Sequence, residues 1–275
     1  MRLPQFVVNA FAVGDAPFTG NPAAVVPLDA WLPDGLLQRI AEQNNLAETA
    51  FVVVHPDETG ARALRWFTPA KEVRLCGHAT LATAAVLDRV LELDGEGEAF
   101  AFSTLSGRLG CERRGDAYGM DFPADPAPVA GEGLRVLAEA VVGRALEPAR
   151  VREGKDDLFV ALDDPGEVTG YALGEAAIRA VPKRGVILSA AAREEDDYDV
   201  VSRCFYPEFG IDEDPATGSA HTLIGPYWCA RLGRERVTCR QASRRDGRLT
   251  VADRPGGRVE LVGRWRLFLA GEIEV

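Results

Sequence analysis

The sequence predicts an α+β fold of two similar domains, each with short strands wrapped around one central helix. The first observation is that residues 77–93 place apolar side chains on nearly every face of a helix, so that this helix must be enclosed by protein. The second is an internal repeat, and the third is a proline-rich segment between the two copies. Wrapping the strands around the helix is the simplest way to bury it completely.

The elements of the first half follow from local patterns. Val and Phe residues favour extended backbone, the turn Gly20-Asn21-Pro22 separates two strands, and a helical stripe runs from Pro33 towards Asn45. Pro226 lies in the second central helix, where a missing backbone donor costs about 3 kcal/mol, so we expect a kink or an early end near Gly225. The expected strands are 5–13, 23–26, 51–54 and 64–67, and the expected helices are 33–45 and 77–93.

The second half repeats the plan of the first. Three short matches occur in the same order at similar spacing, which predicts an ancient duplication. The matched pairs are Arg65–Pro69 with Arg203–Pro207, Ala79-Thr80 with Ala216-Thr217, and Ser106–Leu109 with Asp246–Leu249.

Prolines mark the boundary between the two domains. Pro123, Pro126 and Pro128 resist both helix and strand pairing, so we expect a linker at 123–129. The predicted domains are an N-terminal one at 1–122, joined by a C-terminal strand at 263–275, and a C-terminal one at 130–262.

Composition excludes several classes of protein. The net charge of −11 argues against a nucleic-acid partner, which needs a clustered basic surface. The five cysteines are scattered, with no C-x-x-C pair, and so indicate neither a disulfide framework nor a zinc site. No stretch approaches the roughly 20 apolar residues of a membrane span. We therefore expect a cytoplasmic protein with no membrane or nucleic-acid partner.

The starts of the two central helices are the strongest local candidates for a site. Cys76–Thr80 and Asp214–Ser219 are rich in small residues, and Gly77 and Gly218 allow close backbone approach. Free N–H groups and the helix dipole attract an anion such as a carboxylate at such a start. A simpler interpretation is that Asp214 and Thr217 only cap the helix.

Two ionisable residues in the first half could carry chemistry. Capping does not explain an imidazole at His78 beside a glycine, which favours a functional histidine. Glu48 lies just ahead of an apolar strand, where it is either a solvated residue or a desolvated acid/base with a raised pKa. We interpret His55 and His221 as structural or surface residues.

The motifs of other chemistries are missing from the sequence. It contains no H-E-x-x-H, phosphate loop, G-x-G-x-x-G or G-x-S-x-G, so metal, nucleotide and acyl-enzyme mechanisms lack their usual marks. Ser219 could be a nucleophile, but nothing nearby in the sequence marks a base for it.

Four runs, in order along the chain, carry a resemblance to a known family. They are Phe18–Val26, Glu48–Phe51, Cys76–Thr80 and the specific run Glu213–Ala220. Together they resemble the PhzF-like proteins of the diaminopimelate-epimerase-like superfamily, over Phe6 to Gly271. The resemblance implies two pseudo-symmetric domains, each a mixed sheet around a central helix, with the active site in the cleft between them. It also implies that the last strand returns to the first domain.

The resemblance further implies an isomerase that needs no cofactor or metal. In the best-understood member of this family, a glutamate matching Glu48 moves a hydrogen within a dihydroxyanthranilate-type substrate, helped by residues matching His78, Asp214 and Ser219. We therefore expect Glu48 to act as general acid/base on a small carboxylate, with His78 and Asp214 as the other catalytic residues. Homodimers are common in the family. The expected substrate-binding residues are Asn21, Gly77, Ala79, Thr217, Gly218 and Ser219.

Two alternative functions remain open from the sequence. Related racemases and epimerases use one cysteine from each domain, and here Cys76 is present while Asp214-Pro215 occupies the second position. An amino-acid racemase using Cys76 is thus one alternative, and a non-catalytic binding protein on the same scaffold is the other. Asn9 and Ala242 depart from the usual family residues, aspartate and glycine, which leaves the identity of the substrate open.

Overall fold

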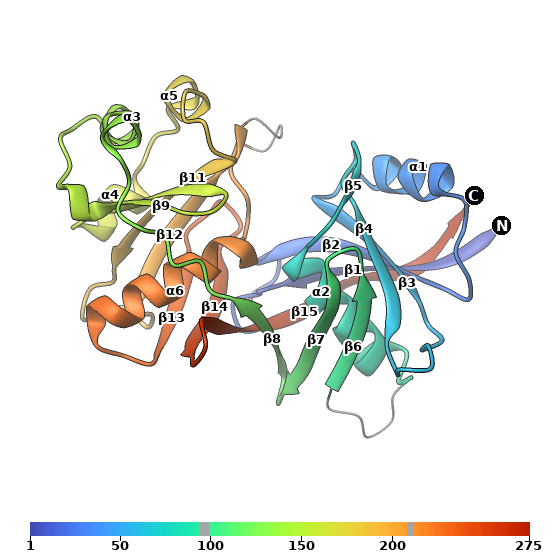
Figure 1. The fold of residues 1–275 in the computed structure, drawn as a ribbon. Helices are drawn as coiled ribbons and strands as arrows, with labels where there is room; N and C mark the ends of the chain where they lie inside the picture. Colours follow the sequence, from blue (N-terminus) through green and yellow to red (C-terminus); the bar gives the residue numbers. More distant parts are fainter. Residues whose placement is uncertain (94–98, 208–211) are drawn as a thin grey trace. The chain divides into compact units, whose positions relative to one another are not determined.

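The computed structural model describes residues 1–93, 99–207 and 212–275 (Figure 1). Contacts within the chain define two compact units. Unit 1 consists of Met1–Asp121 and Val262–Val275, and unit 2 consists of Phe122–Leu261. Each unit combines a mixed sheet with helices.

The strands of unit 1 form a closed circuit. They are hydrogen-bonded in the order β1-β2-β3-β4-β6-β7-β8-β15, and β15 also pairs with β1. This last pairing is antiparallel and runs from Arg2 opposite Glu274 to Ala10 opposite Trp265. The strands are β1 (Arg2–Ala10), β2 (Asn21–Leu28), β3 (Glu48–Val53), β4 (Arg62–Phe67), β5 (Glu72–Val73), β6 (Ala99–Thr104), β7 (Gly107–Arg114), β8 (Ala117–Pro123) and β15 (Arg258–Glu274).

Unit 1 encloses an apolar helix, as the sequence predicts. Helix α2 (Gly77–Ala85) continues as a π-helical turn, η1 (Val86–Val90), and every residue from His78 to Ala85 is buried. The hydroxyls of Thr80 and Thr83 donate to the carbonyl oxygens four residues earlier, at 2.6 and 2.7 Å, so these polar groups are satisfied within the helix. Helix α1 (Asp34–Asn44) packs against β2, β3 and β4 through Leu37 and Ile40.

In unit 2 the strands are hydrogen-bonded in the order β14-β13-β12-β11-β10-β9, and β14 also pairs with β15. The central helix α6 contacts β11, β13 and β14. The strands are β9 (Val151–Glu153), β10 (Asp157–Ala161), β11 (Gly185–Ala191), β12 (Val200–Phe205), β13 (Arg236–Gln241) and β14 (Gly247–Arg254). The helices are α3 (Glu132–Val142), η2 (Pro148–Arg150), α4 (Pro165–Thr169), α5 (Glu175–Arg179) and α6 (Gly218–Leu232).

The strand pairings confirm the internal repeat. From β1 to β7 the successive pairs are antiparallel, parallel, antiparallel, parallel and antiparallel, and the pairs from β9 to β14 follow the same sequence. In each unit the central helix lies, in the sequence, between the fourth and fifth strands of this series. The two units are therefore two copies of one topology.

An ion pair is also repeated. Arg65 of unit 1 binds both carboxylate oxygens of Glu72, at 2.7 and 2.8 Å, and lies 5.1 Å from the ring centre of Phe67. Arg203 of unit 2 binds both oxygens of Glu213, at 2.6 and 3.1 Å, and lies 5.0 Å from Phe205. The matched Arg-x-Phe segments thus have the same local structure.

Helix α6 does not end near Gly225, so the expectation of an early break is wrong. The helix runs through Pro226 to Leu232. Pro226 has no N–H to donate to the carbonyl of Thr222, and the backbone N–H of Asp125 donates to that oxygen instead, at 3.0 Å. A donor from outside the helix therefore offsets the hydrogen bond that the proline removes.

The proline-rich segment 123–129 makes further contacts with unit 2. The N–H of Ala124 donates to the carbonyl of Gly257 at 2.8 Å, and Val129 forms a β-bridge with Arg152. A carboxylate oxygen of Asp125 accepts the N–H of Lys155 at 2.8 Å. These bonds attach the segment to unit 2, which includes all of residues 123–129.

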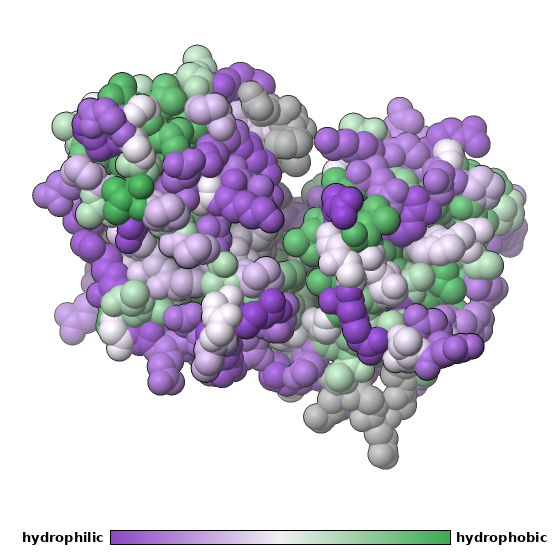
Figure 2. Space-filling view, in the orientation of Figure 1, coloured by the Kyte–Doolittle hydropathy of each residue, from purple (hydrophilic) through white to green (hydrophobic). Residues whose placement is uncertain are grey.

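The visible surface of each unit is mostly hydrophilic, with small separate apolar patches (Figure 2). Within the described residues, no helix has both the length and the apolar character needed to cross a membrane.

Gly225 allows α6 to approach β14. A Cβ atom at Gly225 would lie 2.1 Å from Cγ1 of Val251. We predict that Gly225→Ala lowers the free energy of unfolding by about 1–3 kcal/mol, because the overpacking outweighs the helix propensity gained. Urea denaturation would measure the change.

The matched control is Gly133→Ala on helix α3 of the same unit. A Cβ there meets nothing within 4 Å, so we expect unchanged or higher stability. Equal effects of the two substitutions would contradict the packing argument.

Candidate active site

In unit 1 the fold brings Glu48 and His78 together. Glu48 is the first residue of β3, where it pairs with Ala23 of β2, and His78 is the second residue of α2. Oε2 of Glu48 lies 3.1 Å from Nε2 of His78, and the two side chains are 18% and 8% exposed. Both atoms are buried, and the angle between the groups is not that of a hydrogen bond, so neither atom has such a partner among the described residues.

The other ring nitrogen of His78 faces two further residues. Nδ1 lies 3.5 Å from Sγ of Cys76 and 3.5 Å from Nδ2 of Asn21. Asn21 begins β2 directly after Gly20. This turn requires glycine, because Gly20 has a φ of +78° and an added Cβ would lie 2.4 Å from the Ala10 oxygen. The imidazole is thus held between a carboxylate on one side and a thiol and an amide on the other.

The neighbours of His78 determine its charge. Burial lowers the pKa of His78, but the nearby Cys76 and Glu48 raise it by more, so that it lies well above the usual 6.5. Burial and the charge of Glu48 raise the pKa of the Cys76 thiol, against the opposing effect of His78. The charge of Glu48 thus favours an imidazolium at His78, and burial together with that charge favours a protonated thiol at Cys76.

Glu48, Cys76 and His78 are also the group of potential metal ligands found in the described part of the chain, with ligand atoms within 4.8 Å of one another. The carboxylate approaches Nε2 of the ring and the thiol approaches Nδ1. A single ion can bind only one of these two nitrogens. The arrangement therefore suits proton movement along the three groups better than it suits a metal.

The start of α2 has no side-chain cap. Cys76 occupies the capping position in extended conformation, with no hydrogen bond from its side chain to the helix. The first N–H groups of a helix have no acceptor within the helix. This start has Gly77 and Ala79 in its first turn, and such helix starts in general attract anions.

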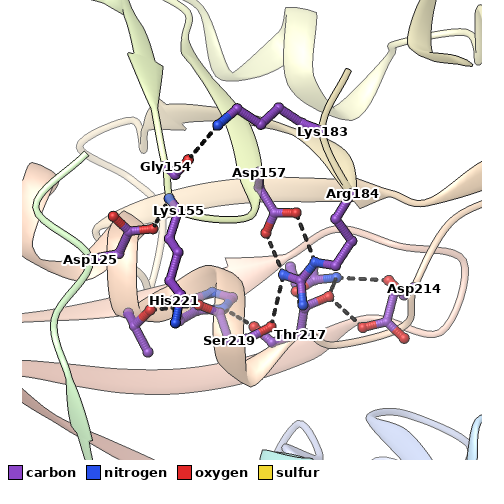
Figure 3. A network of polar contacts seen from close by, with 12 residues as sticks. Asp125, Gly154, Lys155, Asp157, Lys183, Arg184, Asp214, Thr217, Ser219 and His221 are labelled. Carbon is purple, nitrogen blue, oxygen red and sulfur yellow. Dashed lines mark hydrogen bonds and ion pairs between the residues drawn. The ribbon is translucent and has the colours of Figure 1, made fainter. Parts of the chain in front are cut away.

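In unit 2 the start of α6 is also uncapped (Figure 3). Thr217 occupies the capping position, but its hydroxyl donates to Oδ2 of Asp214 instead of accepting a helix N–H. The buried Gln241 accepts the N–H of Thr217 at 2.7 Å and donates to the carbonyl of Asp214 at 2.7 Å. Thr217 thus stands at the capping position, as the simpler interpretation has it, but its side chain makes no capping hydrogen bond.

Ser219 lies in the first turn of α6 and is exposed. Its Oγ accepts a hydrogen bond from Nη2 of Arg184 at 3.1 Å. Arg184 also binds both carboxylate oxygens of Asp157 (Figure 3). Gly218, which precedes Ser219, is buried at the same helix start.

The remaining histidines lie outside these two groups. His221 is fully buried inside α6, where burial lowers its pKa to about 4, and its Nδ1 lies 2.7 Å from the carbonyl oxygen of Thr217. His55 is exposed, 3.6 Å from Asp29. Both positions agree with a structural or surface role.

The predicted site residues thus form two groups, one in each unit. The group in unit 1 contains Asn21, Glu48, Cys76, Gly77, His78 and Ala79, and the group in unit 2 contains Asp214, Thr217, Gly218 and Ser219. Sequence reasoning missed Asp157, Arg184 and Gln241. A charged residue at the first position of a buried strand, as Asp157 is, was a signal for one of them.

Comparison with known proteins identifies the chain. Its fold matches a solved hydroxyproline epimerase from Agrobacterium vitis over 99% of this chain and 92% of that one, with a TM-score of 0.55 at 11% identity. The structure of a PhzF-family phenazine biosynthesis protein from Enterococcus faecalis matches over 100% of both chains, with a TM-score of 0.87 at 38% identity. The chain therefore has an α+β fold of the diaminopimelate-epimerase-like class, and its two repeated units agree with the prediction.

The family follows from the sequence matches. Residues 8–266 match the family model described as phenazine biosynthesis-like protein, PhzC-PhzF. A relative named "Uncharacterized isomerase PA2770", from Pseudomonas aeruginosa, is 46% identical over 100% of both chains. The chain belongs to the PhzC-PhzF family, as the resemblance of its motifs predicts.

The charge of Glu48 is expected to hold His78 in its protonated form. We predict that Glu48→Gln lowers the pKa of His78, because the substitution removes a raising charge. NMR titration of the imidazole carbons would measure the shift. The exposed Glu42→Gln serves as the control and should leave this pKa unchanged.

The raised pKa also links His78 to stability. Its contribution is fully present below pH 6.5 and is lost as the pH rises through the higher pKa of the folded state. In Glu48→Gln the loss should begin at the same pH but be smaller and be complete at a lower pH, because only the pKa of the folded state falls. An unchanged titration of His78 would contradict the assigned interaction.

Proposed function

We propose that this protein is a cofactor-independent isomerase that moves a proton between carbon atoms of a small carboxylate substrate, with Glu48 as the general acid/base. The supporting observation is the pair of buried atoms, Oε2 of Glu48 and Nε2 of His78. They lie 3.1 Å apart without forming a hydrogen bond. Buried polar atoms that make no hydrogen bonds are costly, and a bound substrate would supply hydrogen bonds to this ion pair.

The charges in unit 1 support transfer of a proton from the substrate to Glu48. With His78 as imidazolium, the adjacent Glu48 is paired with a positive charge and is ready to accept a proton from carbon. His78 then donates to the oxygen on which negative charge develops. Glu48 returns the proton to another carbon on the same face, so that the product has the formula of the substrate and no redox partner is needed.

The uncapped helix starts support a negatively charged substrate. In the proposal, the N–H groups after Cys76 in unit 1 and those after Thr217 in unit 2 are anion-binding groups, with Asn21, Gly77, Ala79, Gly218 and Ser219 as substrate-binding residues. Asp214, which accepts the hydroxyl of Thr217, is proposed to orient the substrate. The buried free thiols of all five cysteines support a reducing, cytoplasmic location.

Hydrogen exchange tests the role of Glu48. Candidate carboxylates incubated with the protein in deuterated water should gain deuterium at carbon, as followed by proton NMR. We predict that Glu48→Gln lowers the exchange rate by about 10²–10⁴-fold, because the amide cannot accept the proton.

Glu42→Gln, which neutralises an exposed carboxylate on α1, is the matched control and should exchange at the wild-type rate. Undiminished exchange in Glu48→Gln would rule out Glu48 as the base.

Racemisation by Cys76 is the second candidate, because its thiol lies 3.5 Å from Nδ1 of His78. In the leading proposal, Cys76→Ser retains most of the exchange and the substrate is isomerised without inversion. Loss of exchange in Cys76→Ser, together with inversion at the α-carbon of an amino acid, would favour the racemase.

A further inference from the structure

Asp157, Arg184 and Ser219 form a chain of hydrogen bonds in unit 2 that ends at the start of α6 (Figure 3). Asp157 is the first residue of β10 and is 4% exposed. Nε of Arg184 donates to Oδ1 of Asp157 at 2.9 Å, and Nη2 donates to Oδ2. Nη2 also donates to Oγ of Ser219, at 3.1 Å.

The guanidinium of Arg184 is held by a ring on its face as well as by hydrogen bonds at its edge. It lies 5.1 Å from the ring centre of Tyr206. The backbone of Gly185, next in the chain, is so close to this ring that a Cβ would lie 2.2 Å from it. A two-point contact with a buried carboxylate and a stacked ring leave Arg184 little freedom.

The direction of the last hydrogen bond matters for Ser219. A guanidinium donates hydrogen bonds and cannot accept them. The Oγ of Ser219 must therefore act as acceptor towards Arg184, which directs the hydroxyl hydrogen elsewhere. Among the described residues no acceptor for this hydrogen is found, and Ser219 is exposed.

We propose that Arg184, held by Asp157, is a positioning residue that makes Ser219 an obligatory hydrogen-bond donor to a carboxylate group at the start of α6. This inference rests on the proposed function, because it adds the carboxylate-binding arrangement of unit 2 to that site. The donor hydroxyl would act beside the uncapped N–H groups of the helix, and the positive charge of Arg184 would strengthen the hydroxyl as a donor.

The ligand class follows from the donors. A hydroxyl donor, helix N–H groups and a fixed cation favour an anion over a neutral group of the same shape. We therefore use benzoate as the probe and benzamide as its neutral counterpart. Calorimetry should show binding of benzoate and much weaker binding of benzamide.

A double-mutant cycle tests whether Arg184 acts through Ser219. We predict that Arg184→Met and Ser219→Ala each weaken benzoate binding by roughly tenfold, about the value of one charge-assisted hydrogen bond. The double variant should bind no more weakly than Ser219→Ala alone, because the effect of Arg184 is lost once the hydroxyl is absent.

The matched control is Lys183→Met. It removes the neighbouring positive charge, whose ammonium binds Gly154 and Glu153 and does not contact Ser219. Its benzoate affinity should equal that of the wild type. An equal loss in Lys183→Met would show a general charge effect and overturn the proposal, as would additive effects of Arg184→Met and Ser219→Ala.

Arg184→Lys provides a second cycle if Arg184→Met does not fold, since it keeps the charge but not the two-point contact with Asp157. Its effect on benzoate binding should also vanish in the Ser219→Ala background. Failure of wild-type protein to prefer benzoate over benzamide would overturn the proposal.

The same experiments separate this inference from the proposed function. Glu48→Gln should slow exchange by about 10²–10⁴-fold but keep benzoate binding. Arg184→Met should weaken benzoate binding but leave Glu48 in place as the base. If Arg184→Met and Ser219→Ala weaken benzoate binding additively while Glu48→Gln slows exchange as expected, only the role of Arg184 is refuted. Undiminished exchange in Glu48→Gln refutes only the role of Glu48.

Discussion

Each unit depends on a central helix whose first turn is left without a side-chain cap. Capping residues normally satisfy the N–H groups at a helix start and contribute about 1 kcal/mol. Here Cys76 does not cap α2, and the hydroxyl of Thr217 is committed to Asp214. The surrounding structure keeps both starts in place by other means, including the amide of Gln241 in unit 2. The missing caps thus fall at the positions where the proposal places an anion.

Much of the fold could be predicted because it follows from burial. A helix with apolar residues on all faces must be enclosed, and α2 is buried from His78 to Ala85. The short repeat around Arg65 and Arg203 predicted a duplication, which the alternating strand pairings and the matching ion pairs bear out. Motif resemblance predicted the family. The residues around Glu48 alone left open whether this carboxylate was solvated or desolvated.

The rest could not be predicted because it depends on contacts between distant segments. Arg184 reaches Ser219 and Asp157 only after β10, β11 and α6 have packed together, and no local pattern indicates that pairing. Pro226 predicted a kink or an early end of the helix. The early end was wrong because the N–H of Asp125 supplies the missing donor, and nothing in the sequence shows this contact. The local sequence shows that Pro226 removes a helix hydrogen bond, but it does not show which distant donor replaces it.

The return of β15 to β1 has a consequence for how the chain folds during synthesis. Residues 122–261 form unit 2 from one continuous stretch, whereas unit 1 needs its last strand from residues 262–275. The first half of the chain therefore leaves the ribosome with an open edge on β1, which only the final residues cover. The second unit can complete its structure before the first, and truncation of the C-terminus should harm the N-terminal half most.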